Sequence, residues 1–159
     1  GGQHKLNDEY FKRIEALNFT LEHDDGQNIE TITKAEIILV GVSRTSKTPT
    51  CIYLANLGIK AANIPLIPNQ DLPKFDKNKN LTVIALITTP QNLVEVRKKR
   101  AIELGLDPKK DEYTNINSVT KEIDDAKRLF NKMGWPTIDT TRRSVEETAA
   151  AIMSIRAQE

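Results

Sequence analysis

The chain has 159 residues, 38% of them apolar, which is enough to bury one substantial core but few for two independent ones. Its 23 basic and 22 acidic residues leave a net charge of +1, so nothing attracts the whole chain to nucleic acid or to an anionic membrane. The apolar runs are far shorter than the roughly 20 residues that span a bilayer. The single cysteine excludes an internal disulfide. We therefore expect a cytoplasmic protein that binds neither membrane nor nucleic acid.

The first 33 residues are predicted to form a helix and a connecting turn. The helix should end near His23, before the turn-forming residues 24–28. Because the chain begins in polar, helix-like sequence, we expect residues 1–33 to be the tail of a missing N-terminal region and residues 34–159 to be the main domain. The apolar residues expected on one buried helix face recur at three- and four-residue spacing and are Leu6, Tyr10, Ile14, Leu17 and Leu21.

After this turn, strands and helices are expected to alternate. Thr89 and Ser144 precede two of the helices as N-caps, and Ser144 forms a capping box with Glu147. The alternation predicts an α/β fold, a parallel sheet flanked by helices on both faces, with an exposed loop at residues 68–80. The expected strands are residues 37–40, 61–67, 81–87 and 135–139, and the expected helices are residues 49–57, 90–104, 118–133 and 144–156.

A candidate phosphate-binding loop follows the first strand. The pattern G-x-x-x-x-G-K-[ST] is matched at every defined position except Ser46. A loop that leaves a buried strand and opens a helix aims backbone N–H groups at one point, where the helix dipole also favours phosphate oxygens. The simpler alternative is a strand-to-helix turn rich in Ser and Thr. The residues expected to bind the nucleotide are Gly41, Val42, Ser43, Arg44, Thr45, Ser46, Lys47 and Thr48.

Within this loop, Lys47 is expected to reach a terminal phosphate, and the Thr48 hydroxyl to bind Mg²⁺. Ser46 must adopt a backbone conformation that glycine adopts more easily, at a cost of roughly 1 kcal/mol. Pro49 should hold Thr48 away from helical dihedral angles. We expect a P-loop-kinase-like fold with a nucleotide site at the loop.

Much of the chain resembles the pyruvate, phosphate dikinase regulatory proteins. The resemblance is strongest from Ala35 to Thr50, and it runs from about Tyr10 to the end of the chain. Other matching stretches are Asp24-Asp25-Gly26, Tyr53-Leu54-Ala55, residues 60–66, Thr89-Pro90 with Arg97 and Arg100, and residues 138–148. Family members carry a further N-terminal region, so the chain is similar to their C-terminal nucleotide domain alone.

The resemblance implies an unusual pair of reactions. In the family, a phosphoryl group passes from ADP to a threonine of pyruvate, phosphate dikinase, beside its phosphorylated catalytic histidine, and inactivates it. In reverse, inorganic phosphate attacks the phosphothreonine and releases pyrophosphate. A sister branch acts on phosphoenolpyruvate synthase, but residues 138–144 look closer to the dikinase branch. Relatives also suggest a homodimer, in which the first helix could pack against another chain.

Two groups of residues are expected to support the loop. Arg97 and Arg100 share one helix face and could clamp phosphate, unless they belong to a solvated face balanced by Glu95 and Glu103. By analogy with nucleotide kinases, the adenine is expected to contact Thr141, Arg142 and Arg143.

The general base is expected among the acidic residues, with Asp25 preferred over Asp24 and Glu36. His23 could assist the base, but a lone histidine near a helix end is more often a hydrogen-bonded cap. Cys51 is expected to be a core residue. Two other functions stay open at this stage. One is a nucleotide-binding or target-docking module that is inactive without its missing part, and the other is a small-metabolite kinase.

Overall fold

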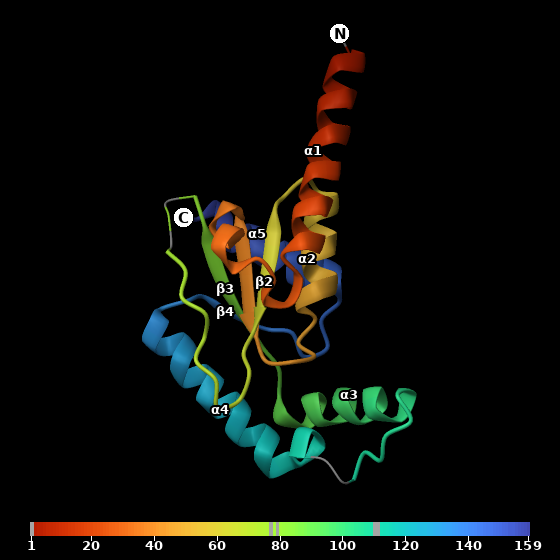
Figure 1. The fold of residues 1–159 in the computed structure, drawn as a ribbon, viewed down its shortest axis with the longest axis vertical. Helices are drawn as coiled ribbons and strands as arrows, with labels where there is room; N and C mark the ends of the chain where they lie inside the picture. Colours follow the sequence, from red (N-terminus) through yellow and green to blue (C-terminus); the bar gives the residue numbers. More distant parts are fainter. Residues whose placement is uncertain (1, 77, 79, 110–111) are drawn as a thin grey trace.

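The fold was obtained as a computed structural model, which describes residues 2–76, 78, 80–109 and 112–159, residues 2–6 by their backbone alone. Helices and strands alternate along most of this length (Figure 1). The elements are α1 (Gly2–Glu22), the 3-10 helices η1 (Asp24–Gly26) and η2 (Ile29–Lys34), β1 (Ile37–Gly41), α2 (Lys47–Asn56), β2 (Ala61–Pro65), β3 (Thr82–Ile87), α3 (Pro90–Glu103), η3 (Glu112–Thr114), α4 (Ile116–Met133), β4 (Thr137–Asp139) and α5 (Val145–Ala157).

The four strands form one parallel sheet in the order β2-β1-β3-β4. Ile37 of β1 pairs with Ala61 on one side and with Thr82 on the other. The prediction of an α/β fold with a parallel sheet is thereby confirmed. Because the chain leaves β1 toward β2 and later returns to the opposite side as β3, the order reverses between β1 and β3. In open parallel sheets, ligands bind at the carboxyl ends of strands at such a switch point.

Helices cover both faces of the sheet, and successive side chains of β1 point alternately to one face and the other. Ile37 and Leu39 are fully buried on one face, against α2 and α5. Ile38 and Val40 are buried on the other face, against α4 and the end of α1. Two apolar layers therefore enclose the sheet, as parallel strands require.

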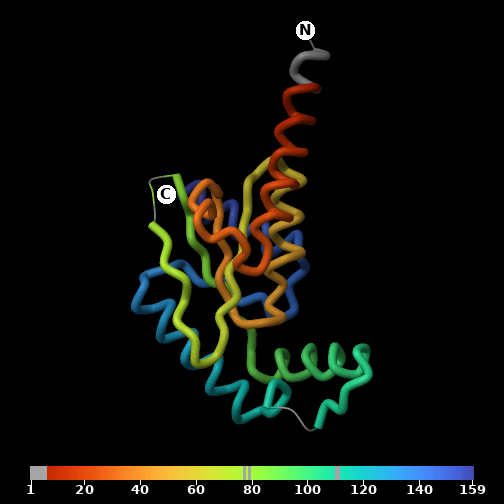
Figure 2. The backbone as a smooth tube through the Cα atoms, viewed as in Figure 1, coloured from red at the N-terminus to blue at the C-terminus, as the bar shows by residue number. Residues whose placement is uncertain are grey.

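The buried face of α1 differs from the predicted one. Ala16, Phe19 and Thr20 are buried, whereas Tyr10 is 51% and Leu21 65% exposed. Figures 1 and 2 show the reason: only the last turns of α1 lie against the sheet and α2, and the earlier turns extend away from them. Leu6 lies outside the residues whose side chains are described. Although α1 has 21 residues, no described helix is both long and apolar enough to cross a membrane.

Several predicted boundaries are corrected by a few residues. α2 begins at Lys47, so Pro49 does not keep Thr48 out of the helix. Proline is accommodated because the first-turn amides of a helix have no intrahelical acceptor. β2 ends at Pro65, β4 begins at Thr137 and α4 begins at Ile116. Strand and helix ends depend on hydrogen bonds between segments, which periodicity does not report.

The predicted caps are present. The Thr89 hydroxyl accepts a hydrogen bond from the Asn92 amide, and the Ser144 hydroxyl accepts one from the Glu147 amide. The loop expected at residues 68–80 is exposed at all its described residues except Leu72 and Phe75, which pack against the core. Residues 77 and 79 of this loop lie outside the described part of the chain. The proposed division at residue 33 stays a prediction, although Ile32 is fully buried in the main core.

Glu36 lies at the amino end of β1, opposite the end where the candidate loop begins. Its carboxylate accepts a hydrogen bond from the Lys60 amide at 2.8 Å and forms an ion pair with Arg156 at 2.8 Å. These contacts join β1 to β2 and to α5. Glu36 is therefore a structural residue, and it is removed from the candidates for the general base.

Replacing Glu36 with alanine should lower the free energy of unfolding by about 1 to 2 kcal/mol, because the Lys60 amide and the Arg156 guanidinium lose their acceptor. Denaturant unfolding would measure the change. Glu30→Ala, at an exposed carboxylate, serves as the control and should change stability by less than about 0.5 kcal/mol. Equal stabilities of the two variants would contradict this role for Glu36.

Candidate phosphate-binding site

The loop of residues 41–48 lies at the switch point, where β1 ends beside β3 and α2 begins. Gly41 is required there by space. A Cβ atom at this position would lie 2.8 Å from the carbonyl oxygen of Leu86 and 2.8 Å from the Thr45 hydroxyl. Any larger residue would push the loop away from β3. The first glycine of the motif thus allows a close approach of two strands' ends.

Two residues of the loop have left-handed backbone conformations, Arg44 with a φ of 72° and Ser46 with a φ of 65°. Ser46 therefore adopts the conformation that the motif usually assigns to glycine, as expected. In the described part of the chain, no oxygen accepts a hydrogen bond from the amides of residues 43–48. Such a turn of unsatisfied N–H groups at a helix N-terminus suits an anion.

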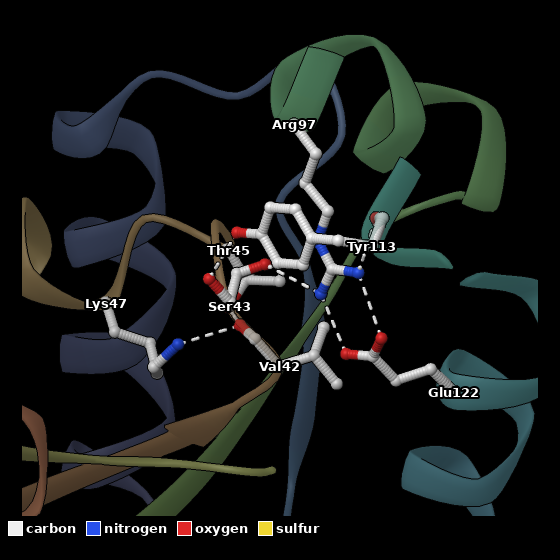
Figure 3. Close-up of polar contacts among 7 residues, drawn as sticks. All are labelled: Val42, Ser43, Thr45, Lys47, Arg97, Tyr113 and Glu122. Atoms are coloured by element: carbon white, nitrogen blue, oxygen red, sulfur yellow. Dashed lines mark hydrogen bonds and ion pairs between the residues drawn. The ribbon is translucent and has the colours of Figure 1, made fainter. Parts of the chain in front are cut away.

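Lys47 lies within the loop and is only 6% exposed. Its ammonium donates a hydrogen bond to the carbonyl oxygen of Val42 at 2.7 Å, across the loop (Figure 3). Burial lowers the pKa of Lys47 from 10.5 to about 8; the negative charge of Asp25 opposes this shift, and the positive charges of Arg97 and Arg44 add to it. The loop therefore contains a buried cation whose charge the protein compensates only in part.

Thr48 contacts Asp24, which the sequence placed second to Asp25 as a functional carboxylate. The Thr48 hydroxyl donates to Asp24 Oδ1 at 2.8 Å, and the Asn63 side-chain amide donates to the same oxygen at 2.7 Å. Asp25 has a left-handed φ of 55°, and its carboxylate is exposed beside the loop. The backbone amide of Asp25 donates to Asn63 Oδ1 at 3.2 Å. Asn63 thus holds both aspartates at the entrance of the loop.

The oxygens of Thr48 and Asp24 suit a hard cation such as Mg²⁺. Among the described residues, no group of three or more His, Cys, Asp or Glu side chains could hold a metal ion. Mg²⁺ at this position would therefore need most of its ligands from phosphate oxygens and water, which is its usual arrangement in phosphoryl-transfer sites.

Arg97 and Arg100, which share a helix face in the sequence, occupy different environments. Arg100 is exposed and lies 3.5 Å from Glu103, as in the alternative of a solvated face. Arg97 is fully buried. It forms two hydrogen bonds with Glu122 of α4, at 2.7 and 2.9 Å. Only Arg97 reaches the loop, and its contact there is with the Ser43 carbonyl oxygen at 3.3 Å.

Arg97 also contacts Tyr113 of η3. Its guanidinium lies 4.2 Å from the centre of the Tyr113 ring and donates to the Tyr113 carbonyl oxygen at 3.1 Å. The Tyr113 hydroxyl is 2.7 Å from the Ser43 hydroxyl. Figure 3 shows the ring and the guanidinium side by side next to Ser43. This cluster of Ser43, Arg97, Tyr113 and Glu122 joins the loop to α3, η3 and α4.

The residues expected near the adenine lie after β4, at the same edge of the sheet. The Thr141 hydroxyl accepts a hydrogen bond from the Thr89 amide at 3.0 Å and is 2.9 Å from the Thr88 hydroxyl. Arg142 and Arg143 are exposed, and Arg142 has a left-handed φ of 58°. Thr141 thus joins the ends of β3 and β4, and contact of these three residues with a base stays a prediction.

His23 and Cys51 have structural roles. Both ring nitrogens of His23 are hydrogen-bonded, one to the Phe19 carbonyl oxygen at 2.8 Å and the other to the Thr31 hydroxyl at 2.7 Å. Cys51 is fully buried, and burial raises the pKa of its thiol to about 12. Neither side chain is available for proton transfer or nucleophilic attack at neutral pH.

Sequence reasoning missed Asn63, Tyr113 and Glu122. Asn63 had a visible signal, a polar residue inside the otherwise apolar strand Ala61–Pro65. Tyr113 and Glu122 had no such signal in the sequence, because they come from separate elements distant from the loop. Tyr113 contacts Ser43 of the loop, and Glu122 contacts Arg97. Their positions follow from the packing of α3 against η3 and α4.

Replacing Lys47 with methionine should increase the free energy of unfolding at pH 7, by about 1 to 3 kcal/mol, because a buried charge is removed. The folded-state pKa of Lys47, about 8, lies below the unfolded value of 10.5. The penalty is therefore complete below pH 8 and is relieved as the pH rises toward 10.5. Denaturant unfolding between pH 7 and 10 should show the variant's advantage shrinking. A pH-independent difference would contradict the burial of this charge.

Comparisons with known proteins confirm the family resemblance. Residues 1–153 match the profile of the Kinase/pyrophosphorylase family. Proteins named, provisionally, pyruvate, phosphate dikinase regulatory protein are 56% identical over 97% of this chain in Pelagibacter ubique and 52% identical over 98% in Bradyrhizobium diazoefficiens. The aligned regions cover 57% and 56% of those proteins, so the chain spans about half their length. The chain belongs to the kinase/pyrophosphorylase family.

Proposed function

We propose that this chain is the nucleotide-binding part of a regulatory phosphotransferase. It transfers a phosphoryl group from ADP to a threonine of pyruvate, phosphate dikinase and removes it by phosphorolysis. The observation that carries the proposal is the 41–48 loop at the switch point of the sheet, which combines the buried ammonium of Lys47 with amides that have no acceptor in the described part of the chain. The relatives' name supports the dikinase as the protein partner.

In this proposal, the loop amides and Lys47 hold the phosphates of ADP. The bond from Lys47 to Val42 is exchanged for bonds to phosphate oxygens, whose negative charge compensates the buried ammonium. Thr48 and Asp24 provide oxygens for Mg²⁺, which offsets the charge of the phosphates during transfer. Asp25, exposed at the entrance of the loop, orients and deprotonates the acceptor threonine.

The two directions use the same site. In the kinase direction, the threonine oxygen bonds to the β-phosphorus of ADP, and AMP leaves. In the reverse direction, an oxygen of inorganic phosphate attacks the phosphothreonine, the threonine leaves with a proton, and pyrophosphate is released. Inorganic phosphate therefore occupies the subsite that the α-phosphate vacates. Both reactions need the cationic loop, so both should depend on Lys47.

The chain's share of its relatives' length leaves a second candidate function. A chain that spans about half of these proteins could bind nucleotide or target and be inactive alone. Transfer of labelled phosphate to the dikinase, with and without the remaining part of a relative, separates the two functions. Phosphoenolpyruvate synthase as an alternative acceptor in the same assay tests the choice of target.

Lys47→Ala should abolish stabilisation by ADP. Bound at about a hundred times its dissociation constant, ADP with Mg²⁺ stabilises the folded state by roughly 2.7 kcal/mol, which raises the unfolding midpoint by about 5 °C or more. Thermal unfolding with ADP, ATP, AMP and inorganic phosphate measures the shift. Lys127→Ala, on the exposed face of α4, is the matched control and should keep it. An unchanged shift in Lys47→Ala would refute the proposed phosphate site.

Asp24→Asn and Asp25→Asn should have different effects. Asp25→Asn should slow transfer about 10²- to 10⁴-fold while ADP affinity changes little, because only the acceptor loses its base. Asp24→Asn should instead weaken Mg²⁺-dependent ADP binding about tenfold, a loss of roughly 1.4 kcal/mol. Calorimetric titration and a transfer assay measure the two quantities. Asp124→Asn, at an exposed carboxylate of α4, is the control. If Asp24→Asn slowed transfer and Asp25→Asn weakened ADP binding, the roles of the two aspartates would be the reverse of those proposed.

A further inference from the structure

The position of Lys47 indicates where the phosphate chain of a bound nucleotide ends. In loops of this motif, the amides cradle the earlier phosphates and the lysine reaches the last ones. Lys47 Nζ lies 2.7 Å from the carbonyl oxygen of Val42, at the beginning of the loop. The last phosphate of a bound nucleotide therefore lies at the Val42–Ser43 end of the loop, away from the first turn of α2.

Tyr113 stands at that end. Its hydroxyl is 2.7 Å from the hydroxyl of Ser43, and both side chains are half-buried. In Figure 3 the ring lies next to Ser43, on the side of the loop that faces α3. A phosphate chain that continued past the subsite of Lys47 would meet this ring.

The ring is held in place from behind. Arg97 is fully buried, stacks on the ring at 4.2 Å and donates to the carbonyl oxygens of both Tyr113 and Ser43, at 3.1 and 3.3 Å. These bonds fix the backbone of Tyr113, and moving its ring aside would remove the aromatic face that covers a buried guanidinium and the contact with the Ser43 hydroxyl. Tyr113 is thus a fixed wall and not a loose side chain.

The charges at the wall also disfavour a further phosphate. The Arg97 guanidinium forms two hydrogen bonds with the Glu122 carboxylate, at 2.7 and 2.9 Å, so its positive charge is already neutralised. Among the described residues, no carboxylate lies within hydrogen-bond distance of the Lys47 ammonium, which donates to a carbonyl oxygen. The ammonium of Lys47 can therefore attract a phosphate inside the loop, whereas the neutralised guanidinium of Arg97 attracts a further phosphate much less.

We propose that Tyr113 is a specificity-determining residue that limits the phosphate site to two phosphates. It would make the loop prefer a nucleoside diphosphate or pyrophosphate over a nucleoside triphosphate or tripolyphosphate. The inference rests on the proposed function, because it needs the 41–48 loop to hold phosphates. It assigns to one side chain a preference that the loop motif does not contain.

Calorimetric titration of the wild type, Tyr113→Ala and Tyr113→Phe with Mg²⁺ and ADP, ATP, pyrophosphate or tripolyphosphate tests the proposal. The wild type should bind the two diphosphates about tenfold or more tightly than the triphosphates. In Tyr113→Ala this ratio should fall below about threefold because the triphosphates bind more tightly. Tyr113→Phe, which keeps the ring and loses the hydroxyl, should retain most of the preference. The simple polyphosphates separate the effect of phosphate number from contacts with the base.

Three results would overturn the proposal: a wild type without the preference, a Tyr113→Ala variant with an unchanged ratio, or a ratio that falls because the diphosphates bind more weakly. If Tyr113→Ala binds no ligand, Tyr113→Leu, which keeps apolar packing on Arg97, replaces it in the test. Loss of ADP binding in Tyr113→Leu as well would show that Tyr113 supports the loop and does not limit the number of phosphates. A wild type that binds none of the four ligands would overturn the proposed function together with the wall, whereas binding without selectivity overturns the wall alone.

Discussion

The burial of two positive charges at one edge of the sheet is the constraint on which the site depends. Arg97 is fully buried and Lys47 nearly so, and both lie against the loop that follows β1. The two charges are compensated differently: Arg97 pairs with the carboxylate of Glu122, whereas the one acceptor of Lys47 in the described part of the chain is the Val42 carbonyl oxygen. The first arrangement offsets much of the cost of burying a charge, whereas the second leaves that cost in place unless a ligand supplies the missing negative charge. This difference in partners indicates that Lys47 is available to bind an anionic ligand, whereas Arg97 stabilises the structure of the site.

Much of the fold could be predicted because its signals are local. The apolar run Ile37–Val40 and the caps at Thr89 and Ser144 each depend on a few neighbouring residues, and all are present. The left-handed conformation of Ser46 was also predictable, since the motif requires it there. The buried face of α1 was not, because periodicity shows that a helix has an apolar face without showing how much of that face meets another element.

The candidate site was predictable only in its contiguous part. The loop residues occur in one run, so their proximity is guaranteed by the chain itself. The pairing of Thr48 with Asp24, and of Arg97 with Glu122, joins residues that are 24 and 25 positions apart. Such contacts arise from the way α3, α4 and η1 pack around the sheet, and an isolated arginine in a basic helix looks the same whether it faces solvent or the core. The two arginines of α3, alike in sequence, are for this reason opposite in environment.

The two aspartates at the loop entrance divide the acidic functions by their hydrogen bonds. Asp24 accepts hydrogen bonds from Thr48 and Asn63, which hold its carboxylate beside the loop. Asp25 is turned outward by its left-handed backbone, and its carboxylate is exposed. A carboxylate held by two donors is fixed in place, whereas an exposed one can meet a hydroxyl brought by another protein. In the proposed function, Asp24 serves the cation and Asp25 serves the acceptor, and the left-handed backbone of Asp25 separates the two carboxylates.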